Sequence, residues 1–158
     1  IVDKYAWVDI GSSYLMNDVS AAYLWGNLKK ADDINVYRLA CWNLYFSLLK
    51  ALEDKKYIEL PRIPINCIHN AHMFYIKVRD FDERSKLIKY LKDNSVSAVF
   101  HYIPLHSASI AKKFSRFDDT DTFTTEHSEK LLRLPMFYGL SNTDIEYVCR
   151  VINEFYSE

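Results

Sequence analysis

The stretch NAHMFYIKVRDFDERSKLIKYLKDN, residues 70–94, sets a strand pattern directly before a helix pattern. From residue 72 to residue 78, one set of side chains alternates with another, which is the period of a strand with one buried face. The first set is His72, Phe74, Ile76 and Val78, and the second is Met73, Tyr75 and Lys77. Residues 82–94 have instead the spacing of a short amphipathic helix. Its expected inward side chains are Leu87, Tyr90 and Leu91. A one-sided strand that leads into a one-sided helix predicts a sheet covered by helices on one face.

The chain N-terminal to this stretch has helical spacing from residue 17 to about residue 52, with Asn17 or Asp18 as the cap. The set Leu39, Trp42, Phe46 and Leu49 follows a spacing that puts its members on one face. We expect one helix of about 50 Å, although a kink near residues 32 and 33 would make two. The aromatic residues expected in the core are Trp25, Trp42, Tyr45 and Phe46.

The C-terminal half supplies another strand and two more helices. Residues 96–102 are expected to form the strand, and residues 125–132 a helix that stops at Leu134 and Pro135. The last helix begins with a capping box formed by Ser141 and Asp144. Its expected inward face is Ile145, Val148, Ile152 and Phe155. The predicted fold class is a small α+β layer with helices packed on one face of the sheet.

Composition excludes several classes of function. Among 158 residues, 26% are charged and the net charge is −1, so nucleic acid is not an expected partner. No stretch approaches the roughly 18 uninterrupted apolar residues that a membrane span requires, so a membrane is not expected either. Three cysteines, Cys41, Cys67 and Cys149, form no close pair and are expected to be core thiols of a protein in a reducing compartment. With three glycines in all, the chain has no glycine-rich phosphate loop.

No metal site is expected, because His69 and His72 would point to opposite faces of a strand. The chain begins without Met, and its first residues are already apolar and aromatic, as is typical of the interior of a domain. We expect no signal peptide.

The stretch HYIPLH, residues 101–106, follows the second predicted strand. Pro104 forces the chain to turn at once, and strand ends of this kind often hold ligand-binding side chains. His101, Tyr102 and His106 offer donors that can meet a phosphate or a sugar hydroxyl. By chemistry alone, a binding site and a structural turn are equally good interpretations.

Four stretches in order resemble the C-terminal portion of the DegT/StrS family of nucleotide-sugar aminotransferases. They are GSSYLMNDVSAAYLWGNL (residues 11–28), NAHMFYIKVRD (70–80), FHYIPLHS (100–107) and SEKLLRLPMFYGLSNTDIEYV (128–148). The sequence GSSYLM, residues 11–16, is most similar to the branch of the family that forms dTDP-4-amino-4,6-dideoxygalactose.

The resemblance implies the C-terminal small domain of a fold-type I transferase that uses pyridoxal 5'-phosphate (PLP). Residues 1–52 would be the turn and long helix that link it to a large domain, and residues 53–158 the small domain. The substrates would be glutamate and a dTDP-4-keto-6-deoxyhexose, in a cytoplasmic homodimer that makes a cell-surface polysaccharide precursor such as lipopolysaccharide or common antigen. The cofactor-binding lysine would lie outside these residues, which predicts an inactive chain.

The resemblance also implies roles for particular residues. Ser13 and Tyr14 would contact the cofactor phosphate of the neighbouring subunit, although Leu15 stands where the family commonly has Arg. His101, Tyr102 and His106 would bind substrate, and no catalytic residue is expected in this part. Two other functions remain open, a non-catalytic interaction module and a PLP-dependent sugar dehydratase of the same family.

Overall fold

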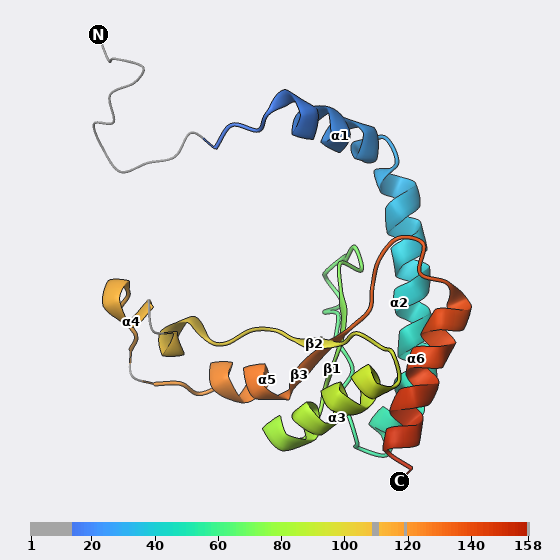
Figure 1. Cartoon of the computed structure of the whole chain (residues 1–158), viewed down its shortest axis with the longest axis vertical. Coiled ribbons are helices and arrows are strands. Elements are labelled where there is room, and N and C mark those ends of the chain that lie inside the picture. The colour runs from blue at the N-terminus through green and yellow to red at the C-terminus, as the bar shows by residue number, and fades with distance from the viewer. Residues whose placement is uncertain (1–13, 109–110, 119, 158) are drawn as a thin grey trace. The chain divides into compact units, whose positions relative to one another are not determined.

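The computed structural model describes residues 14–108, 111–118 and 120–157, with the side chain of Lys112 excepted. The chain divides into two compact units, Ile1–Asp33 and Ile34–Glu158. Figure 1 shows the elements of both.

The first unit contains helix α1, Asp18–Leu28. The side chain of Asn17 caps it, as expected, by accepting a hydrogen bond from the backbone N–H of Ser20 at 2.9 Å. No residue of α1 is buried, and the expected core position of Trp25 is wrong, because 64% of that residue is exposed. The Lys29 ammonium lies 5.2 Å from the centre of the Trp25 ring.

The expectation of one unbroken helix is also wrong. Helix α1 ends at Leu28, and α2 spans Ala31–Asp54. The charges explain why a break at this point is stable: Lys29 and Lys30 follow the C-terminus of α1, and Asp32 and Asp33 occupy the first turn of α2. Each pair of charges complements the dipole of the helix end beside it.

The second unit is built on a three-stranded antiparallel sheet in the order β1-β3-β2. The strands are β1 (Phe74–Lys77), β2 (Val99–Phe100) and β3 (Leu131–Leu134). Leu132 of β3 pairs with Ile76 on one side and with Phe100 on the other. The central position of the sheet therefore belongs to the last strand in the sequence.

Two expectations for these segments need correction. Residues 96–102 form a strand only at 99–100, and the helix expected at 125–132 is α5, Thr124–Lys130, which gives way to β3. In LLRL, Leu132 and Leu134 are buried while Leu131 and Arg133 are half-buried. This alternation belongs to a strand, and pairing on both sides decides against a continued helix.

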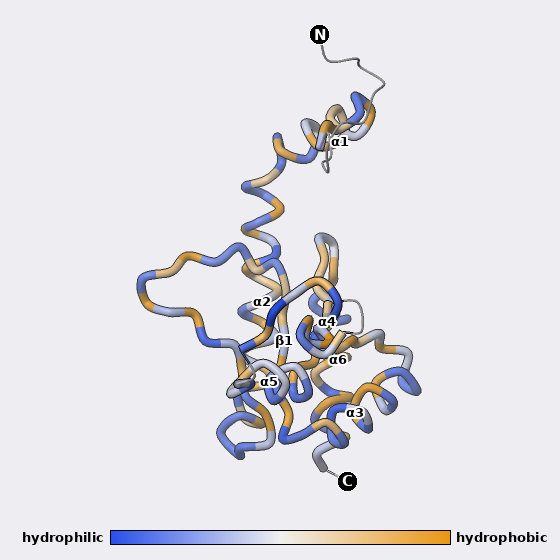
Figure 2. The backbone as a smooth tube through the Cα atoms, turned by 90° about the vertical axis from the view of Figure 1, so that its left-hand side faces the viewer, coloured by the Kyte–Doolittle hydropathy of each residue, from blue (hydrophilic) through white to orange (hydrophobic). Residues whose placement is uncertain are grey.

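The expected one-sided sheet is confirmed. Phe74 and Ile76 are fully buried, and helices α2, α3 (Phe81–Asp93) and α6 (Asn142–Phe155) cover this face, with Trp42 and Tyr45 of α2 in contact with the Phe74 ring. Figure 2 shows hydrophobic and hydrophilic positions alternating along α3. The core side chains that the helices contribute include Trp42, Tyr45, Leu49, Leu87, Leu91, Ile145, Val148 and Ile152. Tyr90 and Phe155, also expected inward, are partly buried against this core.

Side-chain caps position the helices. Ser141 accepts the backbone N–H of Asp144 at 3.1 Å, which confirms the expected cap of α6. Asp80 caps α3 in the same way, through the N–H of Glu83 at 2.9 Å. The remaining helices are short, α4 at Ala111–Phe114 and a 3-10 turn at Leu105–Ser107.

The cysteines behave as expected at two of three positions. Cys41 and Cys149 are buried, and the Cys41 thiol lies 3.6 Å from the carbonyl oxygen of Leu140. Cys67 is exposed, so its expected core position is wrong. Among the described residues, no helix is both long enough and apolar enough to span a membrane.

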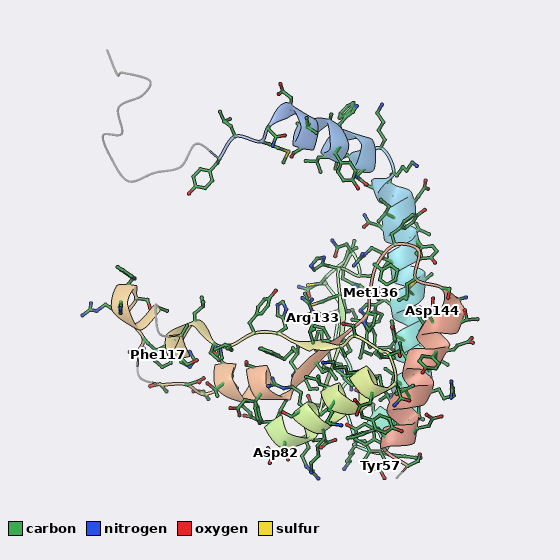
Figure 3. All side chains as sticks on the ribbon, viewed as in Figure 1. Tyr57, Asp82, Phe117, Arg133, Met136 and Asp144 are labelled. Carbon is green, nitrogen blue, oxygen red and sulfur yellow. The ribbon has the colours of Figure 1, made fainter. Side chains whose placement is uncertain are left out.

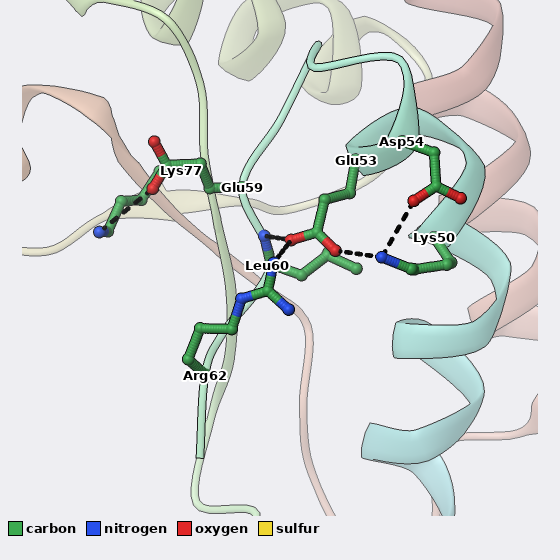
Figure 4. Close-up of polar contacts among 7 residues, drawn as sticks. All are labelled: Lys50, Glu53, Asp54, Glu59, Leu60, Arg62 and Lys77. Atoms are coloured by element: carbon green, nitrogen blue, oxygen red, sulfur yellow. Dashed lines mark hydrogen bonds and ion pairs between the residues drawn. The ribbon is translucent and has the colours of Figure 1, made fainter. Parts of the chain in front are cut away.

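The end of α2 is tied to the following segment by the carboxylate of Glu53 (Figure 4). It accepts hydrogen bonds from the Leu60 N–H at 3.0 Å, from Arg62 at 2.8 Å and from Lys50 at 2.7 Å. Burial alone would raise the pKa of this carboxyl, but the hydrogen bonds from Lys50 and Leu60 and the charge of Arg62 lower it below its usual value. The ionised form is therefore the one that stabilises the fold.

Replacing Glu53 with Gln should lower the free energy of unfolding at neutral pH by about 1–2 kcal/mol, because charge-assisted bonds are lost. Since the carboxyl has a lowered pKa, its contribution is present at neutral pH and is lost as the pH falls. The difference between wild type and E53Q should therefore shrink below about pH 4. Urea unfolding of both proteins across this range measures it. The exposed neighbour Asp54 supplies the control D54N, and an equal effect of both substitutions would contradict the role of Glu53.

Candidate functional site

The HYIPLH turn leaves the sheet directly after β2 and faces helix α5. Together with α5 it borders a shallow pocket of about 330 Å³, in which His101 and Tyr102 lie opposite Thr124, His127 and Ser128. The rings of His101 and Tyr102 are in contact, with 3.6 Å between their centroids. The structure thus brings two of the three expected side chains to one place.

His101 is held by an arginine from the central strand. Nη1 of Arg133 lies 2.8 Å from Nδ1 of His101. A guanidinium has hydrogens to donate and no lone pair to accept with, so Nδ1 must be the acceptor. The imidazole is therefore neutral, with its proton on Nε2, which remains a donor.

The surroundings of His101 favour the same neutral form. Partial burial lowers the pKa of its imidazole, and the charges of Arg133 and His72 lower it further. Both effects oppose a second positive charge beside the guanidinium. His101 is thus suited to donate one hydrogen bond from Nε2 without a change of protonation near neutral pH.

The third expected residue, His106, does not join this pair. Its Nε2 lies 3.1 Å from Oδ2 of Asp121 and 3.3 Å from the hydroxyl of Thr125, and its ring stacks on Phe117 at 4.3 Å. Asp121 also accepts the backbone N–H of Thr124 at 2.9 Å. The Thr125 hydroxyl, ahead of smaller contributions from backbone N–H groups and His106, lowers the pKa of the Asp121 carboxyl. His106 therefore links the end of the turn to the start of α5.

A buried arginine supports the other end of the turn. Arg84 of α3 is the one charged side chain among the described residues that is buried in the core, at 6% exposure. It donates to the Ser128 carbonyl and lies over the Phe81 and Phe100 rings. The Ser128 hydroxyl in turn donates to the Tyr102 carbonyl. These two hydrogen bonds connect α3 to α5 and α5 to the turn.

Sequence reasoning missed the residues that hold the site. Arg133, Asp121 and Ser128 were not predicted to take part. The available signal was Arg133, a charged residue between leucines just before Pro135, which is the pattern of a strand with one open face. Nothing local in the sequence pointed to Asp121 or Ser128.

The two expected cofactor contacts belong to the first unit. Ser13 lies outside the described residues. Tyr14 is described, with a φ of 50° and 92% of the residue exposed. In the described part of the chain, no group of three or more histidine, cysteine, aspartate or glutamate side chains is placed to hold a metal ion.

Comparison with known proteins identifies the chain's relatives. Residues 2–153 match the model of the DegT/DnrJ/EryC1/StrS aminotransferase family. GDP-perosamine synthase of Escherichia coli O157:H7 is 26% identical over 99% of this chain and 41% of its own length. UDP-4-amino-4-deoxy-L-arabinose–oxoglutarate aminotransferase of Shewanella sediminis is 26% identical over 93% of the chain and 39% of its length. The chain thus spans about two fifths of these relatives.

Solved structures share the fold. DesV of S. venezuelae, in complex with a ketimine intermediate, superposes with a TM-score of 0.83 at 21% identity, over 99% of this chain and 41% of its own. PseC of Helicobacter pylori, an aminotransferase of pseudoaminic acid biosynthesis, gives 0.79 at 16% identity, over 99% and 42%. The small sheet and its helices are therefore an arrangement found in aminotransferases.

The contact with Arg133 predicts how His101 titrates. The pKa of its imidazole should lie below the ordinary 6.5 in the wild-type chain. In R133Q it should rise, because the adjacent positive charge is removed, though burial should keep it from rising further. Two-dimensional NMR of the histidine rings across pH measures both values and identifies the tautomer. R150Q, which removes an exposed arginine paired with Glu154 on α6, is the matched control. A wild-type pKa above 6.5, or a proton on Nδ1, would contradict the assignment.

Proposed function

The chain belongs to the DegT/DnrJ/EryC1/StrS aminotransferase family, and we propose that it is the C-terminal part of an enzyme that transfers an amino group from glutamate to a dTDP-4-keto-6-deoxyhexose. The observation that carries this proposal is the family match over residues 2–153, together with a neutral, oriented histidine in the HYIPLH turn. The name of the Shewanella relative includes oxoglutarate, the keto acid that glutamate leaves behind, which supports glutamate as the donor.

We propose that residues 1–52 lead from a large N-terminal domain and that residues 53–158 make the small domain of a fold-type I enzyme. The large domain would carry the lysine that binds PLP. The whole protein would be a cytoplasmic homodimer serving a cell-surface polysaccharide pathway. In this proposal the described residues form one wall of the substrate cleft.

The cofactor would supply the electron sink on which nitrogen is exchanged. The residues of this chain fit a supporting contact to its phosphate. Tyr14 is almost fully exposed, so its hydroxyl is available as a donor, and Ser13 precedes it with a second hydroxyl. Leu15 offers no charge, so this turn would bind phosphate by hydrogen bonds alone.

The substrate contacts would come from the turn. His101 donates from Nε2 and Tyr102 presents an exposed phenol, and both suit sugar hydroxyls or phosphate oxygens. His106 would act from the other end of the turn, with its ring oriented by Asp121. His101 donates in its neutral form, so it can bind a sugar hydroxyl without a change of protonation.

The nucleotide is proposed from GSSYLM, residues 11–16. The names of the two curated relatives contain GDP and UDP, so the choice of dTDP rests on this stretch and on no relative.

The experiment joins the natural upstream sequence to this chain and assays the purified product with glutamate and dTDP-4-keto-6-deoxyglucose. We expect the amino sugar as product and the absorbance of bound PLP, whereas the 158-residue chain alone should give neither. Parallel assays with the GDP- and UDP-linked 4-keto sugars test the nucleotide. A product that has lost a hydroxyl without gaining nitrogen would instead support a dehydratase, and a start codon directly upstream would support an interaction module.

In the joined enzyme, H101Q should lower kcat/KM for the sugar nucleotide by roughly 3–10-fold, the effect of one lost hydrogen bond. R150Q should leave it unchanged, since Arg150 pairs with Glu154 on the surface of α6. An unchanged kcat/KM in H101Q would remove His101 from the proposed site.

A further inference from the structure

The open face of the sheet carries a second pocket, of about 430 Å³, which Arg133 borders. Arg133 and Met136, both labelled in Figure 3, line it together with Arg38 of α2, His72, Met73 and Ser97. The lining residues contain two guanidinium groups and no carboxylate. All of them belong to the second unit.

Neither arginine has an acidic partner among the described residues. Arg38 donates to the carbonyl oxygens of Ala71, at 3.1 Å, and of His72. Arg133 donates to the neutral ring of His101. Both side chains are half-buried, and a guanidinium offers five N–H groups, so donors remain on each.

Three other arginines of the second unit are arranged differently. Arg62, Arg79 and Arg150 are exposed and each forms an ion pair with a glutamate. Arg38 and Arg133 are half-buried without such a partner, although partial burial makes an unpaired charge more costly. Arg84 also forms no ion pair, but its guanidinium lies over the Phe81 and Phe100 rings. A guanidinium also matches the planar oxygens of a carboxylate, or the oxygens of a phosphate, through two parallel hydrogen bonds.

We propose that this pocket is an oxyanion subsite, in which Arg38 and Arg133 bind a carboxylate or phosphate group of a substrate. Ser97 adds a hydroxyl donor, and Met73 and Met136 form apolar walls. Arg133 also holds the ring of His101, so the subsite and the HYIPLH turn share this arginine.

The source of the anion rests on the proposed function. The reaction offers two, the carboxylates of the glutamate–oxoglutarate pair and the phosphates of the sugar nucleotide. A compact dicarboxylate suits a pocket of this size, whereas a nucleotide would extend beyond it.

The test measures binding to the 158-residue chain by NMR, with the His101 ring and the Arg133 backbone amide as reporters. The probes are glutarate, inorganic phosphate and dTDP, each added separately at constant ionic strength. We expect glutarate to bind and to shift both reporters. R133Q should weaken binding by about 10-fold or more, and R133K should weaken it less, because Lys keeps the charge but loses the planar fork.

Arg133 is the first choice for substitution because Arg38 also supports the backbone at residues 71 and 72. Thermal unfolding of each variant shows whether it folds, and R150Q is the control that removes an arginine outside the pocket. Tighter binding of glutarate than of dTDP assigns the subsite to the amino donor, and the reverse order assigns it to the nucleotide phosphates.

The proposal is overturned if none of the three probes binds, or if binding is equal in wild type, R133Q and R133K. Either result would leave the aminotransferase assignment standing, because that is tested by turnover of the joined enzyme with no reference to this pocket.

Discussion

The pairing of β3 between β1 and β2 is the constraint on which the second unit depends. Leu132 and Leu134 enter the core because the strand has a period of two, and the same period places Arg133 on the opposite face. A slip of one residue would bury the guanidinium and expose the leucines. The register of one four-residue strand thus fixes both the core and the charge of the open face.

The guanidinium of Arg133 orients the first histidine of the HYIPLH turn. Arg133 forces Nδ1 of His101 to accept, which leaves a neutral ring with its proton on the far nitrogen. The turn itself is held from two directions, by the chain from Arg84 through Ser128 to Tyr102, and by His106 on Asp121. A donor fixed in this way binds a polar ligand at low entropic cost, which is what substrate positioning needs.

Membership of the aminotransferase family gives these features a setting. The chain covers about two fifths of its curated relatives, and it shares its fold with solved structures such as DesV and the aminotransferase PseC. The described residues contribute three features to this setting. These are the neutral donor of His101, two arginines that form no ion pair, and the hydrogen bonds that hold the turn.

The sequence by itself determined the elements whose signals are local. Alternation predicted β1, the 3.6-residue period predicted α3 and α6, and a serine followed by an aspartate three residues later predicted the start of α6. The likeness of four short stretches was enough to indicate the family. Only the tertiary structure decided that LLRL is the central strand, that the first helix breaks at residues 29 and 30, and that Trp25 and Cys67 are exposed. The tertiary structure also determined that Arg133 contacts the ring of His101 and that Asp121 contacts the ring of His106. The reason is physical: periodicity and capping act over a few residues, whereas strand pairing and the partner of an imidazole depend on residues that only folding brings together.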